Sequence, residues 1–219
     1  MIQPDALAGA VVEGTVGPAV GLLGGTFDPI HNGHLAIAAQ VRDALSLTGV
    51  TFIPAGVPPH KPGQAVSPGV DRAAMIALAI AHTPGFSLST IELDRPGLSY
   101  TADTLAALAS AGRPGSGLEF ILSAEAFAGF PGWHEPGRIL DLARLAVVPR
   151  AGARPIDSAW LDAQLPGWRE RVDFVEAPPI DISASVIRDR VRAGLPIDGL
   201  VPGAVADYIR THRLYTDAL

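Results

Sequence analysis

The sequence lacks cysteine, has a single lysine among its basic residues, and has no apolar run long enough to span a membrane. Without cysteine, disulfides, thiolate metal sites and thiol nucleophiles are excluded. The net charge of −6 argues against a broad basic surface for nucleic acid. We therefore expect neither a membrane partner nor a nucleic-acid partner. A small anionic ligand is still compatible with this charge, because a few local groups are enough to bind it.

A secretory signal pattern is also missing, and we expect a cytoplasmic protein. Residues 1–18 are rich in small side chains without periodicity, which predicts a flexible N-terminal extension. The remaining 19–219 contain enough apolar residues for one sizeable core, since 48% of the whole chain is hydrophobic. We expect a single domain there, ending in a helical portion.

Apolar runs typical of buried strands alternate with helical patterns along the chain. Strands are predicted at 19–23, 50–54, 86–93, 119–122, 145–149 and 172–175. Helices are predicted at 35–45, 71–82, 101–110, 136–143, 183–193 and 204–212, with a short one near Trp160. This alternation predicts an α/β protein with an open, Rossmann-like parallel sheet covered on both faces. The dinucleotide pattern G-x-G-x-x-G is absent at the first strand, so no redox cofactor is predicted.

The stretch GGTFDPIHNGHL at 24–35 follows the first predicted strand and leads into a helix. Its glycines allow close approach of a ligand, and a helix start attracts an anion. His31 and His34 flank that start, where both can donate to phosphate oxygens. The same spacing suits a metal pair, but no neighbouring carboxylate or third ligand completes a zinc set, so no protein-bound metal is predicted.

Further polar residues occur in loops and at helix starts. The only lysine, Lys61, lies in a proline-rich loop at 55–68, whose length is typical of functional loops. Ser183 and Ser185 open a helix that carries Arg188, an arrangement that can grip a triphosphate. The residues alone leave plainer roles open: a solvated lysine, a serine N-cap with a solvent-facing arginine, and a core aromatic at Trp133.

Five segments together resemble one family. They are GGTFDPIHNGHL at 24–35, PPHK at 58–61, SYTADTL at 99–105, WH at 133–134 and ISASVIR at 182–188. The chain is similar to bacterial nicotinate-nucleotide adenylyltransferases of the nucleotidylyltransferase superfamily from about Val20 to Tyr215. That resemblance implies transfer of the adenylyl group of ATP to nicotinate mononucleotide, giving deamido-NAD and pyrophosphate in NAD biosynthesis.

The resemblance also implies roles for individual residues. The catalytic residues implied are His31, His34 and Arg188. Those implied to bind ATP are Gly24, Gly25, Thr26, Phe27, His31, His34, Glu125, Ser183, Ser185 and Arg188. Those implied to bind nicotinate mononucleotide are Asp28, Lys61, Tyr100, Thr101, Trp133 and His134. Mg²⁺ is expected with ATP, held mainly by phosphates and water.

Three positions in two segments depart from the family pattern. The family usually has Gly-x-Asp where this chain has Ser123-Ala124-Glu125, and it usually has a hydroxyl residue at the position of Ala184. Glu125 is kept as a ribose contact. The alternatives are another acceptor (nicotinamide mononucleotide or phosphopantetheine) and a non-catalytic nucleotide-binding regulatory protein. A homo-oligomer is compatible with the sequence, which does not determine the oligomeric state.

Overall fold

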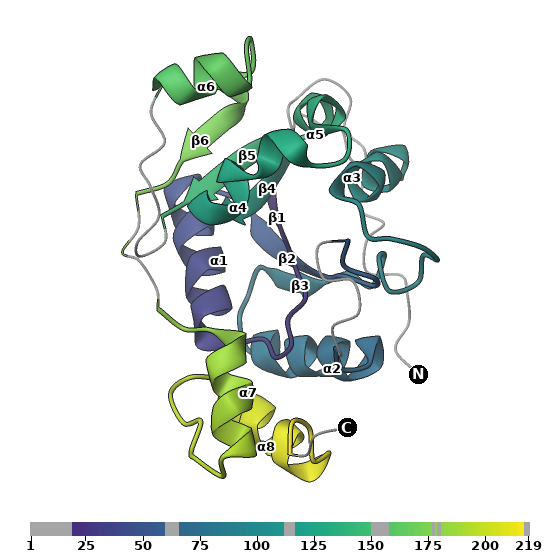
Figure 1. Cartoon of the computed structure of the whole chain (residues 1–219), viewed down its shortest axis with the longest axis vertical. Helices are drawn as coiled ribbons and strands as arrows, with labels where there is room; N and C mark the ends of the chain where they lie inside the picture. Colours follow the sequence, from purple (N-terminus) through teal and green to yellow (C-terminus); the bar gives the residue numbers. More distant parts are fainter. Residues whose placement is uncertain are drawn as a thin grey trace.

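The computed structural model describes residues 19–59, 66–111, 117–149, 158–176, 178 and 181–216 (Figure 1). The expected N-terminal extension at 1–18 and the loop residue Lys61 lie outside these ranges. Within the described ranges, no helix has both the length and the apolar character needed to cross a membrane.

Six parallel strands form one sheet in the order β3-β2-β1-β4-β5-β6. The strands are β1 (Val20–Gly25), β2 (Gly49–Pro54), β3 (Phe86–Leu88), β4 (Leu118–Ser123), β5 (Arg144–Val148) and β6 (Val172–Phe174). This order is that of a doubly wound α/β sheet. The predicted Rossmann-like parallel sheet is therefore confirmed.

Helices cover both faces of this sheet (Figure 1). They are α1 (Asn32–Ala44), α2 (Gly69–Ile80), α3 (Thr101–Ser110), α4 (Ala124–Ala128), α5 (Pro136–Leu142), α6 (Ser158–Gln164), α7 (Ala184–Arg192) and α8 (Gly203–Thr211). Two short 3-10 turns, η2 (Phe130–Gly132) and η3 (Arg169–Arg171), lie between them.

The strands divide their side chains between two apolar cores, as the period of two requires. Leu23 and Phe52 face one core, with apolar side chains of α1, α2, α7 and α8. Leu22 and Ile53, their neighbours in sequence, face the other core, with side chains of α3, α4, α5 and α6. Burial on both faces explains why β1 and β2 are nearly continuous apolar runs rather than alternating ones.

Two local predictions were wrong. The strand predicted at 86–93 ends at Leu88, because Thr90 and Asp94 close a turn: the Thr90 hydroxyl donates to Asp94 Oδ2 at 2.6 Å, and Asp94 N–H donates to the Thr90 carbonyl at 2.9 Å. The segment after β4, where no helix was predicted, contains α4. Ser123 caps this helix by accepting the Ala126 N–H at 3.2 Å, and Phe127 anchors it in the core.

The order of the strands places a crevice between β1 and β4. From β1 the chain proceeds to β2 and β3 on one side of the sheet, and from β4 to β5 and β6 on the other side. Ligands of open α/β sheets bind at the carboxyl ends of strands where this order reverses. Gly24 and Gly25 end β1 and Ser123 ends β4, so the motif at 24–35 opens beside this crevice.

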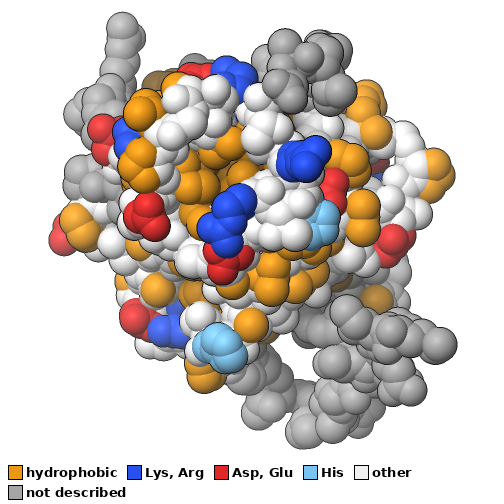
Figure 2. Space-filling view, turned by 90° about the horizontal axis from the view of Figure 1, so that it is seen from below, with side chains coloured by type: hydrophobic (Ala, Val, Ile, Leu, Met, Phe, Trp, Pro, Cys, Tyr) orange, Lys and Arg blue, Asp and Glu red, His pale blue; other side chains and the backbone are white. Residues whose placement is uncertain are grey.

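The end of the molecule that carries α7 and α8 is seen in Figure 2. Acidic and basic side chains are interspersed on the described part of this face rather than gathered by sign. Attraction of an anion at this end therefore depends on individual groups rather than on a broad charged surface.

Candidate active site

Two adjoining cavities open at the carboxyl ends of β1 and β4. The larger has a volume of about 420 Å³ and the smaller about 210 Å³. Gly24, Phe120 and Trp133 line both cavities. Molecules bound in the two cavities would therefore meet at this shared wall.

The larger cavity gathers the predicted phosphate ligands from two distant parts of the chain. His31 and His34 come from the start of α1, and Ser183, Ser185 and Arg188 come from α7. The rest of its lining is mostly backbone and apolar side chains of β1, β4 and α1. The imidazoles thus face a guanidinium and a helix N-terminus across one space, an arrangement suited to a polyanion.

The two histidines form a stacked pair at the N-terminus of α1. Their ring centroids lie 3.6 Å apart, and His31 is buried. The backbone N–H of His31 donates to Nδ1 of His34 at 3.2 Å. Because Nδ1 of His34 accepts this bond, the neutral ring carries its proton on Nε2. The Phe27 ring packs edge-on against His34 at 4.9 Å and holds the imidazole from the other side.

Arg188 reaches from α7 to the turn that follows β1. Its Nη1 donates to the backbone carbonyl of Asp28 at 2.7 Å. Ser183 is the N-cap residue of α7, and its hydroxyl lies 2.6 Å from that of Ser185. The start of α7 is therefore rich in donors and is tied to the turn at Asp28.

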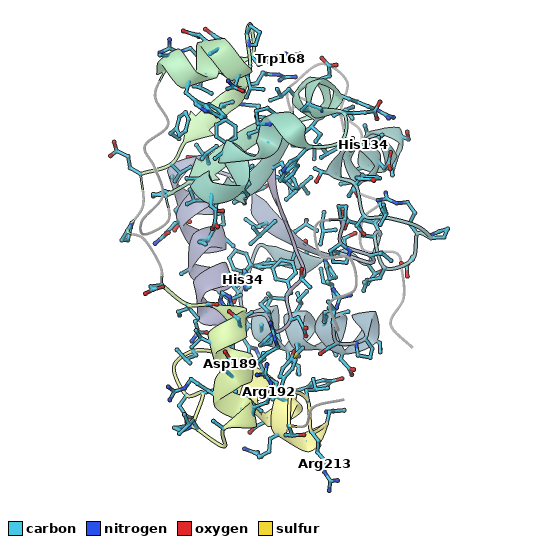
Figure 3. All side chains as sticks on the ribbon, in the orientation of Figure 1. His34, His134, Trp168, Asp189, Arg192 and Arg213 are labelled. Carbon is cyan, nitrogen blue, oxygen red and sulfur yellow. The ribbon has the colours of Figure 1, made fainter. Side chains whose placement is uncertain are left out.

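The smaller cavity is lined by the start of α3 and by aromatic side chains. Tyr100 and Thr101 come from that helix start, and the Tyr100 ring lies 4.3 Å from the ring of His134. Trp133 packs edge-on against Phe120 at 6.2 Å. Figure 3 shows His34 near α7 and His134 beside α3, on opposite sides of the site. This cavity suits a flat ring with an anionic substituent.

Glu92 also lines the smaller cavity, and it is not among the site residues predicted from the sequence. It is 8% exposed, and its Oε1 accepts the Thr104 hydroxyl at 2.7 Å. Burial raises the pKa of Glu92, and hydrogen bonds from Thr104 and Ser99 oppose that shift. Ser99 Oγ in turn accepts the Gly56 N–H at 2.8 Å. The available signal was the one charged residue within the strand predicted at 86–93.

Gly56 shows how closely these segments approach beneath the smaller cavity. A Cβ at this position would overlap the Glu92 backbone carbonyl. Glycine is therefore required where the segment after β2 crosses the segment that carries Glu92. The hydrogen bonds of Glu92 and Ser99 connect the loop between β3 and α3, which carries both residues, to the segment after β2 and to α3.

Several predicted ligands lie elsewhere. Phe27 is 2% exposed and packs in the core, and Asp28 is 5% exposed with its carboxylate turned toward Ser67 and Tyr215. Neither side chain lines either of the two cavities described above, and their ligand roles stay predictions. Gly25 and Thr26, assigned to ATP, line only the smaller cavity. Glu125 is exposed in the first turn of α4 and lines neither cavity.

The described residues contain one set of side chains close enough together to hold a metal ion. Potential ligand atoms of Asp103, His134 and Glu135 lie within 4.8 Å of one another. Glu135 already pairs with Arg138 at 2.8 Å. Of the three, only His134 lines a cavity, and that is the smaller one. This set is therefore separate from the histidine pair.

The fold and the paired cavities are typical of a nucleotide-binding α/β protein whose candidate site lies between its first and fourth strands. The cytidylyltransferase-like family model matches residues 22–190. A probable nicotinate-nucleotide adenylyltransferase of Roseiflexus sp. (strain RS-1) is 50% identical over 196 residues, covering 90% of this chain and 97% of the relative. One with the same description from Thermomicrobium roseum is 42% identical, covering 90% and 91%.

Solved structures agree on the fold. The nicotinic acid mononucleotide adenylyltransferase of Plasmodium falciparum, complexed with NaAD, superposes with a TM-score of 0.74 at 16% identity. The match covers 90% of this chain and 97% of that one. The chain belongs to the cytidylyltransferase-like family and, within it, to the group of nicotinate-nucleotide adenylyltransferases.

Proposed function

We propose that this chain transfers the adenylyl group of ATP to nicotinate mononucleotide, forming deamido-NAD and pyrophosphate in NAD biosynthesis. The observation that carries the proposal is 50% identity over 196 residues to a relative described by that activity. Two adjoining cavities with a shared wall suit a reaction between two nucleotides. Both substrates are nucleotides of the cell interior, which agrees with the cytoplasmic location expected above.

The reaction requires little covalent chemistry from the protein. A phosphate oxygen of nicotinate mononucleotide attacks the α-phosphorus of ATP, a new P–O bond forms, and the bond to the β-phosphate oxygen breaks. The attacking phosphate is already ionised near neutral pH, so a strong general base is not needed. Both reactants are anions, and the protein's task is to align them and to stabilise the negative charge at the α-phosphate.

On the ATP side, we assign His31 and His34 to the phosphates, with Nε2–H of His34 as a donor to the transferring group. Arg188 and the N-terminus of α7, with Ser183 and Ser185, hold the triphosphate from the opposite side. Gly24 lets the nucleotide lie against the end of β1. Glu125 stays a predicted ribose contact, and its test is whether alanine at this position changes the KM for either substrate.

On the acceptor side, we assign Tyr100, Thr101, Trp133 and His134 to nicotinate mononucleotide. Backbone N–H groups at the start of α3 meet the pyridine carboxylate, and Trp133 packs against the ring. A carboxylate gains more from this helix start than a neutral carboxamide, which explains a preference for the nicotinate form. Lys61 is retained as a phosphate contact from the proline-rich loop.

The substrate is MgATP. None of the described residues that line the larger cavity is Asp or Glu. The divalent ion is therefore expected to be held by ATP phosphates and water rather than by protein carboxylates in that cavity. The protein donors named above then meet the phosphate oxygens that the ion leaves exposed.

Pyrophosphate release tests the proposal directly. Purified protein is given MgATP with nicotinate mononucleotide, nicotinamide mononucleotide or phosphopantetheine in separate reactions. We expect the highest kcat/KM with nicotinate mononucleotide. Release with phosphopantetheine alone would assign a different acceptor. Binding of ATP without release in any reaction would indicate a non-catalytic nucleotide-binding protein.

A further inference from the structure

Asp28 is the centre of a buried junction beside the larger cavity. Its carboxylate is held by two donors from distant segments: the Tyr215 hydroxyl at 2.6 Å from Oδ1, and the Ser67 N–H at 3.3 Å from Oδ2. Burial and the Asp28 carboxylate both raise the pKa of Tyr215, so its hydroxyl stays protonated and donates. The end of the chain is thereby attached to the turn that follows β1.

Arg72 supports the same turn from α2. It is 2% exposed, and it donates to the Thr26 carbonyl at 2.8 Å and to the Ser67 carbonyl at 2.9 Å. Burial lowers the pKa of Arg72, and the Asp28 carboxylate opposes that shift. Arg72 is thus committed to backbone carbonyls on both sides of the turn, and Ser67 is bonded both to Arg72 and to the Asp28 carboxylate.

The turn at Asp28 also holds a residue that lines the larger cavity. The Asp28 carbonyl accepts Nη1 of Arg188 at 2.7 Å, and Arg188 lines the larger cavity. Rotation of Asp28 would move this carbonyl and the guanidinium bonded to it. Asp28 thus connects the two residues: its carboxylate accepts from Tyr215, and its backbone carbonyl accepts from Arg188.

We propose that Tyr215 is a positioning residue for ATP binding: its hydroxyl orients Asp28, and Asp28 holds Arg188 at the phosphate cavity. The inference rests on the proposed function for its place in the reaction, because Arg188 is assigned to ATP there. Tyr215 lines neither cavity, so it acts through other residues and not by touching substrate.

The chain offers a matched control. Tyr208, on α8, donates to Asp71 Oδ1 at 2.9 Å and joins the C-terminal segment to α2. Figure 1 shows α8 beside α2 at the same end of the molecule. Both tyrosines are half-buried and donate to an aspartate of a distant segment, Asp28 being buried and Asp71 half-buried. The hydrogen bond of Tyr208 goes to α2 and not to the turn at Asp28. Tyr208→Phe therefore removes a similar bond without disturbing Arg188.

The test compares Tyr215→Phe with Tyr208→Phe by calorimetric binding of α,β-methylene-ATP and by steady-state kinetics. For Tyr215→Phe we expect the dissociation constant of the analogue and the KM for ATP to rise about tenfold, the scale of a lost hydrogen bond to a charged group. The KM for the acceptor should change less than twofold. Tyr208→Phe should leave all three constants within twofold of the wild type.

Coupling is tested in an Arg188→Lys background. If Tyr215 acts through Arg188, Tyr215→Phe adds little to the loss caused by Arg188→Lys, so the two effects are not additive. Additive effects, or an ATP-analogue affinity of Tyr215→Phe equal to that of Tyr208→Phe, would overturn the inference. Analogue binding needs no acceptor, so this outcome is distinct from a wild type that releases no pyrophosphate, which would overturn the proposed function.

Discussion

The tautomer of the neutral His34 ring is set by its neighbour His31. Its Nδ1 accepts the His31 N–H, and this bond directs the ring proton to Nε2. The stacked His31 ring and the edge of Phe27 leave the imidazole little rotational freedom. A donor held in advance contributes most where charge develops in the transition state.

Replacing His34 by alanine should lower kcat about 100- to 1000-fold, the usual effect of losing one such donor. The circular dichroism spectrum should be unchanged, because the ring is only half-buried. His82→Ala, at an exposed position after α2, is the control and should be kinetically silent. Near-normal turnover of His34→Ala would remove this residue from the catalytic set.

Glu92 has a different kind of role, because its bonds go to the framework of the acceptor cavity. Glu92→Ala should raise the KM for nicotinate mononucleotide about tenfold, since Thr104 and Ser99 lose their common acceptor, while the KM for ATP stays constant. Glu92→Gln keeps one acceptor oxygen and should recover part of the loss. The control is Asp162→Ala, which removes an exposed carboxylate of α6 that lines neither cavity. Equal changes in both KM values would show a general structural effect instead.

At the scale of elements, three helices begin at the cavities. The N-termini of α1, α3 and α7 start at Asn32, Thr101 and Ala184. Each helix start carries N–H groups that have no partner within the helix's own i to i−4 pattern, together with the positive end of a dipole. In a chain of net charge −6, these helix starts concentrate positive potential where basic side chains are few.

The start of α7 can be tested by a double substitution. Ser183→Ala with Ser185→Ala removes two hydroxyls from the larger cavity but leaves the backbone N–H groups. The KM for ATP should rise about three- to tenfold, since part of the donor set is lost. Ser110→Ala, which removes an exposed hydroxyl near the end of α3, serves as control. An unchanged KM for ATP would mean that the hydroxyls act only on the helix itself.

At the scale of the whole molecule, the end of the sheet opposite the cavities contains an acidic pair of which one member, Glu119, is buried. Glu119 is 4% exposed and follows the first residue of β4, and Asp173 lies on β6, where Arg144 binds it at 2.7 Å. Burial, and then the Asp173 carboxylate, raise the pKa of Glu119 to about 8. The folded protein therefore keeps a proton on Glu119 at neutral pH.

This proton makes folding stability depend on pH. In the unfolded chain Glu119 ionises near its ordinary pKa of 4.5, whereas in the folded chain it does so near 8. Between these values the folded state binds the extra proton, so the free energy of unfolding from this group falls as the pH rises. Glu119→Gln should reduce this fall, measured as the urea midpoint from pH 5 to pH 8, and Glu170→Gln at an exposed site should not. A wild-type midpoint that rises over this range, or equal slopes in both variants, would contradict the assignment.

The sequence predicted most of the fold because buried strands and helices have different periods. β1 and β2 were recognisable as apolar runs, and α3 was predicted with its observed bounds. The failures were local. Thr90 and Asp94 ended β3 through a turn, and Ser123 started α4 by capping it, because side-chain bonds to nearby groups overrode the apolar pattern.

For the site, the family resemblance implied phosphate-binding roles for His31, His34, Ser183 and Arg188. The structure brings these four residues together around one cavity, and their roles stay predictions. The same reasoning could not separate Asp28 from the substrate contacts. Within the motif it looks like another polar ligand. Its burial and its bond to Tyr215, 187 residues away, exist only in the folded chain.

By itself, the sequence determined the parallel α/β architecture, the family and the residue types available for phosphate binding, since these follow from periodicity and short motifs. Only the tertiary structure decided which polar residues face a cavity and which hold the framework, as for Glu92 and Asp28. The physical reason is that a side chain's direction and its distant partners depend on packing between segments far apart in the chain. Local sequence patterns do not contain that information.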